Sequence, residues 1–262
     1  MTWSILARDP ATGWMGAAVA SRYFAVGAVI PHIRDRRAAV ATQAYLSPLW
    51  GIEGADRIAA GEAPEAVLAD LIARDGNHAR RQWHALDGAG RIAAHTGEDC
   101  VGWAGHVAAD DVSVAGNMLA GPQVLSATLD TFLAARDQPL PDRLLLAMEA
   151  GEAAGGDSRG RQSAALRVHR GEAYPWLDLR ADDHAEPLAE IRRLLDVARE
   201  RFVHVAETMP TAADFSGPSD RSAMESAIAR AEADRAARGV ASRSLASPSG
   251  LSLAGTSVQQ RG

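Results

Sequence analysis

The sequence contains no lysine, and all 27 of its basic residues are arginines. Schiff-base chemistry, a phosphate-binding loop with its lysine and a Ser–Lys catalytic pair are therefore excluded. Cysteine is almost as scarce. Cys100 is the only one, so no disulfide can form within the chain, and a reduced, cytoplasmic setting is expected.

Long apolar runs and an excess of positive charge are missing as well. No stretch of about 18 apolar residues is present, so we expect no transmembrane helix and no membrane partner. The formal net charge of -6 argues against a nucleic-acid partner, because nucleic acids favour clustered basic residues. The chain opens without a basic segment followed by an apolar stretch, so a signal peptide is not predicted.

Extended and helical patterns alternate in blocks over residues 1–205. Turn residues at 9–13 and at 87–90 lie between extended segments and predict two β-hairpins. Prolines at the first turn of apolar-striped segments predict helices, the clearest of them opening at Pro64 and ending before Gly76. The predicted strands are 3–7, 14–21, 38–43, 82–86, 91–95, 112–119, 162–168 and 176–180.

The order of these segments predicts the fold class. Strands are followed by a helix pair, strands, a second helix pair opening at Pro122 and Pro141, strands, and a last helix from Pro187 through Phe202. Strands joined by hairpins form antiparallel sheets, and helix pairs inserted between them suit two packed sheets with helices on both outer faces. We therefore predict an α+β fold, a four-layer αββα sandwich of two antiparallel sheets flanked by helices.

Residues 206–262 differ in composition from the rest. Pro210, Gly217 and a Ser-rich end at 242–257 predict linker and disorder. Between them, residues 219–238 form an Ala-rich helical pattern in which Met224 and Ile228 are the only sizeable apolar residues. We expect a polar C-terminal tail with an isolated helix rather than a second domain.

Thr2 is the first candidate for chemistry. Removal of Met1 is expected when the second residue is small, and it would leave Thr2 as a free N-terminus at the start of a strand. A threonine hydroxyl is a weak nucleophile and needs a base beside it. Its own α-amine, which titrates near pH ~8, can serve as that base.

Three other segments carry candidate site residues. Thr42 and Gln43 end a strand and could face one pocket, with Gln43 as oxyanion donor or substrate clamp. The alternative is that Thr42 is an ordinary strand residue. Gly116 and Asn117 offer a backbone N–H and a side-chain amide to an oxyanion, although a glycine in a strand also marks a bulge or close packing. The third segment is a glycine-rich loop that follows the second helix pair.

In that loop, residues 155–163, Asp157 and Arg161 could orient the nucleophile or bind a substrate carboxylate. The alternative is a structural loop held by an internal Asp–Arg pair. His95, His106 and His184 match no compact metal-ligand spacing, so neither a metal nor another cofactor is expected. A Gly-x-Ser-x-Gly elbow is also missing, which argues against a Ser-His-Asp hydrolase.

Several of these segments together resemble the uncharacterised domain family 1028, which is described as having an N-terminal-nucleophile (Ntn) hydrolase fold. The resemblance spans residues 1 to about 200 and implies the αββα fold and amide hydrolysis, without a substrate. It is carried by TWSILARDP (2–10), GAAVAS (16–21), AVG (25–27), ATQAY (41–45), AHTG (94–97), GNMLAG (116–121), GGD (155–157), GRQSA (160–164) and DDH (182–184).

Residues 18–22 also resemble the second strand of proteasome-type β subunits. Those enzymes have an aspartate where this chain has Ala20, and they use a lysine that this chain lacks. The departure leaves the α-amine of Thr2 as the base, with Ser21 and Arg22 as supports. Arg22, Thr42, Gln43, Asp157 and Arg161 then remain as candidate substrate-binding residues.

Two hypotheses follow from the sequence. The first is an amide-bond hydrolase that acts on a small-molecule or peptide amide, with Thr2 as nucleophile and Ser21 and Asn117 beside it. The second is a non-catalytic binding or scaffold protein that keeps the fold, motivated by Ala20 and the missing lysine. Homo-oligomers are common in this architecture, so a homo-oligomer is possible.

Overall fold

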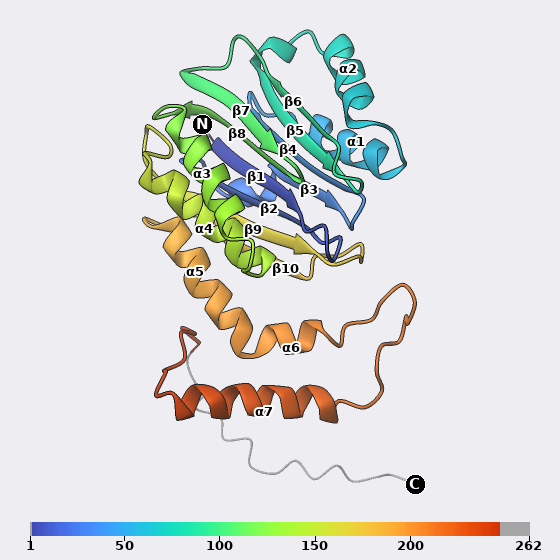
Figure 1. Cartoon of the computed structure of the whole chain (residues 1–262), viewed down its shortest axis with the longest axis vertical. Coiled ribbons are helices and arrows are strands. Elements are labelled where there is room, and N and C mark those ends of the chain that lie inside the picture. Colours follow the sequence, from blue (N-terminus) through green and yellow to red (C-terminus); the bar gives the residue numbers. More distant parts are fainter. Residues whose placement is uncertain (1, 247–262) are drawn as a thin grey trace.

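Two antiparallel sheets lie face to face in the computed structural model, which describes residues 2–246 (Figure 1). The larger sheet has the strand order β10-β9-β2-β1-β8-β7, and the smaller has the order β3-β4-β5-β6. The strands are β1 (Thr2–Arg8), β2 (Met15–Ser21), β3 (Pro31–Arg34), β4 (Ala38–Ala44), β5 (Arg81–Asp87), β6 (Ile92–Thr96), β7 (Trp103–Ala109), β8 (Val112–Leu119), β9 (Ser163–His169) and β10 (Leu177–Ala181).

Helices cover the outer face of each sheet, which completes four layers (Figure 1). Two of them pack on the smaller sheet, α1 (Pro48–Ala59) and α2 (Pro64–Arg74). Three pack on the larger sheet, α3 (Gln123–Ala134), α4 (Leu140–Ala153) and α5 (Pro187–Val197). The predicted αββα sandwich is confirmed. Among the described helices, none has the length and apolar character that crossing a membrane requires.

Side chains point alternately to the two faces of each strand, and this divides the apolar core into three layers. In β1, Ile5 packs toward the helices of the larger sheet, whereas Leu6 packs between the sheets. In β4, Ala39 lies between the sheets and Val40 lies under α1 and α2. Adjacent residues of a strand point to opposite faces, and here both faces are covered. The strands therefore carry continuous rather than alternating apolar sequence.

The two strands that the sequence pattern does not predict, β3 and β7, both lie at the edge of a sheet. β3 is four residues long and begins with Pro31, which is tolerated at the first position of an edge strand. β7 has no buried residue and contains Gly105, where its register with β8 shifts. Edge strands bury less apolar surface, so their sequences show little periodicity.

The last predicted helix extends beyond Phe202. α5 continues through a π-helical turn (Ala198–Phe202) into α6 (Val203–Ala206). The expected helix of the C-terminal segment is α7 (Ser222–Ala237), and it packs against this extension through the buried side chains of Met224 and Ile228. The disorder expected at 242–257 falls mostly on residues 247–262, outside the described residues.

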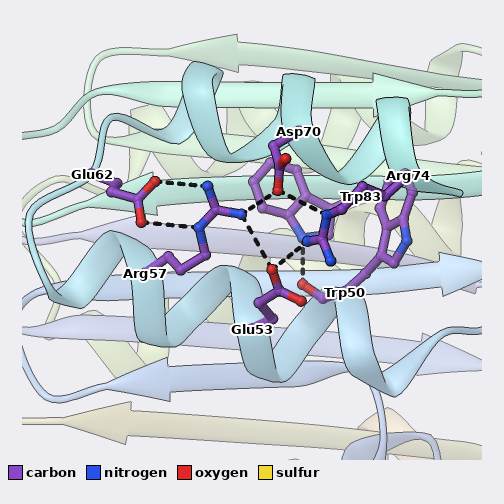
Figure 2. A network of polar contacts seen from close by, with 7 residues as sticks. All are labelled: Trp50, Glu53, Arg57, Glu62, Asp70, Arg74 and Trp83. Atoms are coloured by element: carbon purple, nitrogen blue, oxygen red, sulfur yellow. Dashed lines mark hydrogen bonds and ion pairs between the residues drawn. The ribbon is translucent and has the colours of Figure 1, made fainter.

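A network of ion pairs joins α1 to α2 on the outside of the smaller sheet (Figure 2). Arg57 holds Glu62 with two hydrogen bonds of 2.9 and 2.7 Å and also contacts Glu53 and Asp70. Arg74 closes the network by pairing with Glu53 and Asp70. These hydrogen bonds to Arg57 lower the pKa of Glu62 and of Asp70 below their ordinary values.

We predict that Arg57→Met lowers the thermal unfolding midpoint at low ionic strength and at neutral pH. The lowered carboxylate pKa values mean that this stabilisation is present above the ordinary pKa of 4.5 for Glu62 and is lost as the pH falls below it. The difference from the wild type should therefore shrink in acid and, because the network is exposed, in high salt. Arg230→Met on α7 is the control. A difference that is independent of salt would contradict the electrostatic account.

Candidate functional site

Thr2 lies at the start of β1, a central strand of the larger sheet, and its side chain faces the space between the sheets. Thr2 is 5% exposed, and its Oγ1 donates a hydrogen bond of 3.1 Å to Oγ of Ser21 at the end of β2. On its other side, Thr2 pairs with Asn117 of β8. Thr2, Ser21 and Asn117, predicted together, are therefore brought together by strand register.

Asn117 is buried and uses its side-chain amide inside the protein. Its Nδ2 donates to the carbonyl oxygen of Thr2 at 3.4 Å and to Oε1 of Gln82 in β5 at 3.0 Å. Both amide hydrogens are thus directed at protein acceptors. In this structure Asn117 holds the start of β1 against the opposite sheet instead of directing a donor at a pocket.

The inter-sheet layer is polar at the end where Thr2 lies, and Gln82 is its centre. Nε2 of Gln82 lies 2.8 Å from the carbonyl oxygen of Gly116 and 3.0 Å from that of Gly105. Carbonyl oxygens only accept, so these two contacts determine which end of the Gln82 amide is nitrogen. Its oxygen must then accept, and it does so from Asn117 and, at 2.8 Å, from Nε2 of Gln43.

The chain of hydrogen bonds continues from Gln43 to His84. Because Gln43 donates with its nitrogen, its Oε1 accepts from the hydroxyl of Ser4 at 2.8 Å. The oxygen of Ser4 then accepts from Nε2 of His84 at 2.9 Å, and Nδ1 of His84 accepts from Ser113 at 2.9 Å. Nε2 of His84 therefore carries a proton, and because burial keeps the ring neutral, Nδ1 is its acceptor. Complete burial, and secondarily the neighbouring His106, lower its pKa to about 3.

Thr42 and Gln43 do not share a pocket, contrary to expectation. Gln43 points between the sheets, so Thr42 points to the opposite face, where its hydroxyl donates to the carbonyl oxygen of Ser47 at 3.1 Å. Thr42 is fully buried beneath α1 and holds the turn into that helix. Gln43 is also fully buried and is linked to Thr2 through the amides of Gln82 and Asn117.

The glycine-rich loop lies against the same end of the larger sheet. Asp157 forms a β-bridge with Leu119, and its Oδ2 accepts from the backbone N–H of Arg22 at 2.8 Å. Since Arg22 follows Ser21, this contact places the loop beside Thr2. Asp157 pairs with Arg159 at 3.4 Å, whereas Arg161 pairs with Glu152 and Glu186. An internal Asp–Arg pair does hold the loop, with Arg159 in the place expected for Arg161.

Two pockets open at this end of the molecule. The glycine-rich loop lines one of about 520 Å³, together with Glu152 and Ala120. The second, of about 160 Å³, is lined by Asn117, the strand-paired neighbour of Thr2. The remaining residues that line it are Ala44, Tyr45, Arg80, Asp99, Cys100, Val101 and Met118.

Two residues of the smaller pocket have a strained backbone. Ala44 at the end of β4 has φ 67°, and Met118 next to Asn117 has φ 52°. This left-handed conformation costs a residue with a Cβ atom about 1–2 kcal/mol. Such strain tends to gather at functional sites, so its occurrence twice around one pocket supports a function there.

Histidine and cysteine contribute little to this site. Within residues 2–246, no three His, Cys, Asp or Glu side chains gather in a way that could hold a metal ion. The sulfur of Cys100 lies 3.5 Å from the carbonyl oxygen of Arg81, and burial raises the pKa of this thiol. A raised pKa favours the neutral thiol, which is a weaker nucleophile than the thiolate.

Comparison with known proteins places the chain in a family. The sequence profile of a family of unknown function, DUF1028, matches residues 2–191. The chain belongs to the DUF1028 family. A crystal structure of a DUF1028 protein from Silicibacter pomeroyi superposes with a TM-score of 0.77 at 33% sequence identity, covering 84% of this chain and 99% of that one. Among curated proteins, none matches the chain.

The DUF1028 match contains both sheets, helices α1–α4 and every candidate site residue, and it ends within α5. The π-helical turn, α6 and α7 lie beyond it. The expected resemblance to this family is therefore confirmed. The C-terminal helices lie outside the residues that the family profile matches.

The amide network escaped the sequence analysis, although a signal for it was present. Gln82 and His84 stand two residues apart in a strand whose other members are apolar, so both must face the same side. Polar residues at alternate positions of a buried strand need partners on the facing sheet. The pocket residues Arg80, at the end of a short 3-10 helix, and Asp99, in a turn, gave no comparable signal.

The buried neutral His84 predicts a loss of stability in acid. Its folded-state pKa, about 3, lies below the ordinary value of 6.5, so the unfolded chain takes up a proton first and stability falls as the pH drops below 6.5. From about pH 7 to about pH 5 this one residue should account for a loss of about 2 kcal/mol. The free energy of unfolding should be measured by urea titration at several pH values across this range. Its slope against pH should be shallower for His84→Gln than for the wild type, whatever the stability of the variant at neutral pH. An unchanged slope would mean that His84 is not buried in the neutral form.

Proposed function

We propose that this protein is an amide-bond hydrolase of the Ntn type, in which Thr2 becomes the nucleophile once Met1 is removed. The observation that carries the proposal is the position of Thr2. Its hydroxyl is at the start of a central strand and is bonded to Ser21, which precedes the Arg22 contact to the glycine-rich loop. Its strand-paired neighbour Asn117 lines the strained pocket. A terminal residue held from both sides in this way meets the need for a fixed nucleophile.

The chemistry can be written with the groups of one residue. The α-amine of Thr2 takes the hydroxyl proton while Oγ1 bonds to the amide carbon of the substrate. The C–N bond then breaks, the leaving amine receives that proton, and an ester to Thr2 remains. Water, activated by the same amine, hydrolyses the ester and restores the hydroxyl. Small-molecule or peptide amides are the substrate class that this cycle consumes.

A second candidate is a non-catalytic binding protein of the same fold. It is favoured by Asn117, whose amide hydrogens point at Gln82 and Thr2 and not at the pocket. Ala20, where proteasome-type subunits carry an acid, favours it as well.

We also propose a cytoplasmic location and a possible homo-oligomer, the first because a lone cysteine suits a reducing compartment.

We predict that a β-lactone electrophile acylates the full-length protein once, on Thr2, as measured by peptide mass spectrometry. Thr2→Ala should abolish this adduct, and Thr2→Ser, which keeps a hydroxyl and an amine, should retain it. Thr12→Ala in the exposed β1–β2 turn is the matched control and should react like the wild type. Acylation that persists in Thr2→Ala would exclude Thr2 as the nucleophile, and an unreactive wild type would favour the binding protein.

A further inference from the structure

The pocket of about 160 Å³ beside Asn117 has one charge of each sign in its lining, from Arg80 and Asp99. Over the described range, residues 2–246, neither side chain forms an ion pair, either with the other or with a third group. Most other arginines of this chain are paired, and Arg81 next to it contacts Asp75 at 2.9 Å. Both residues are exposed, and a small pocket that offers two opposite charges without ion-pair partners suits a ligand that carries both complementary charges.

Arg80 is held in place without using its hydrogen-bonding edge. Its guanidinium lies 4.3 Å from the centre of the Tyr45 ring, and Tyr45 lines the same pocket. Arg81 fixes this turn, because it donates to the carbonyl oxygens of Tyr45 and Leu46. Stacking on a ring leaves the planar N–H edge of a guanidinium available to a carboxylate. Arg80 is therefore pre-positioned to donate hydrogen bonds to a carboxylate.

The size of the pocket limits the ligand. An apolar cavity of about 150 Å³ holds a molecule of six carbon atoms, so about 160 Å³ accommodates roughly six or seven non-hydrogen atoms. The ammonium, α-carbon and carboxylate of an α-amino acid account for five of about seven such atoms. Val101 and Met118, which also line the pocket, supply apolar surface for the first carbons of a side chain.

We infer that this pocket binds the zwitterionic head group of a small α-amino acid, with its carboxylate on Arg80 and its ammonium on Asp99. The inference deepens the proposed function, since it places an amino-acid part of the substrate beside Asn117, the strand-paired neighbour of Thr2. The inference depends on the proposed function only in the claim that the bound amino acid is part of an amide substrate that Thr2 cleaves. Binding of the head group depends on Arg80 and Asp99 and needs no chemistry at Thr2.

The test uses three small molecules built on the same three-carbon chain and the full-length Thr2→Ala protein, in which the chemistry is absent. L-2-aminobutyrate carries both charges, butyrate lacks the ammonium, and 1-aminopropane lacks the carboxylate. Saturation-transfer NMR titrations at low ionic strength should show L-2-aminobutyrate binding about fivefold more tightly than either of the others. Arg80→Gln should remove its advantage over 1-aminopropane, and Asp99→Asn its advantage over butyrate.

Arg230→Gln on α7, far along the chain from the pocket, is the control and should leave all three affinities unchanged. Equal binding of the three molecules, or a preference that survives Arg80→Gln and Asp99→Asn, would overturn the inference. If Thr2 is acylated but no preference is found, the inference fails and the proposed function stands. If the preference is found but Thr2 is unreactive, the pocket is an amino-acid site in a binding protein.

Discussion

The side-chain amide of Gln82 lies between the two sheets, where water cannot complete its hydrogen bonds. Every donor and acceptor there must be satisfied by protein, because an unpaired buried polar group costs about 1–3 kcal/mol. Two backbone carbonyls orient this amide, and their effect passes through Gln43 and Ser4 to the proton of His84. In the other direction it passes through Asn117 to the first residue of β1. The position of Thr2 therefore depends on both sheets.

Because of this network, the layer between the sheets has a polar part near Thr2 and an apolar part away from it. Away from Thr2 the layer is apolar and contains Leu6, Val19 and Leu86, whose burial holds the sheets together without directional contacts. Near Thr2 the same layer consists of amides, hydroxyls and one imidazole, which fix register and orientation. The apolar part thus supplies most of the stability, and the polar part supplies a single arrangement at the end where the pockets open.

The layered architecture was predictable because it depends on features that a sequence displays: hairpin turns, helix-opening prolines and the order of blocks. β3 and β7 were missed because edge strands bury too little surface to show a pattern. The grouping of Thr2, Ser21 and Asn117 was also predicted. Thr42 and Gln43 are neighbours in β4 and so point to opposite faces, and the sequence alone did not show which of the two faces the other sheet. Arg80 ends a short 3-10 helix and Asp99 lies in a turn, and they line one pocket through the tertiary arrangement, which no local pattern encodes.

The central claim is that Thr2 acts with its own hydroxyl and amine, which requires a free amine on that residue. Intact-mass spectrometry of the purified full-length protein tests this directly. The account predicts a mass lower than that of the whole sequence by one methionine residue, with Thr2 as the first residue in the terminal peptide. Protein that retains Met1 and still hydrolyses an amide would contradict it.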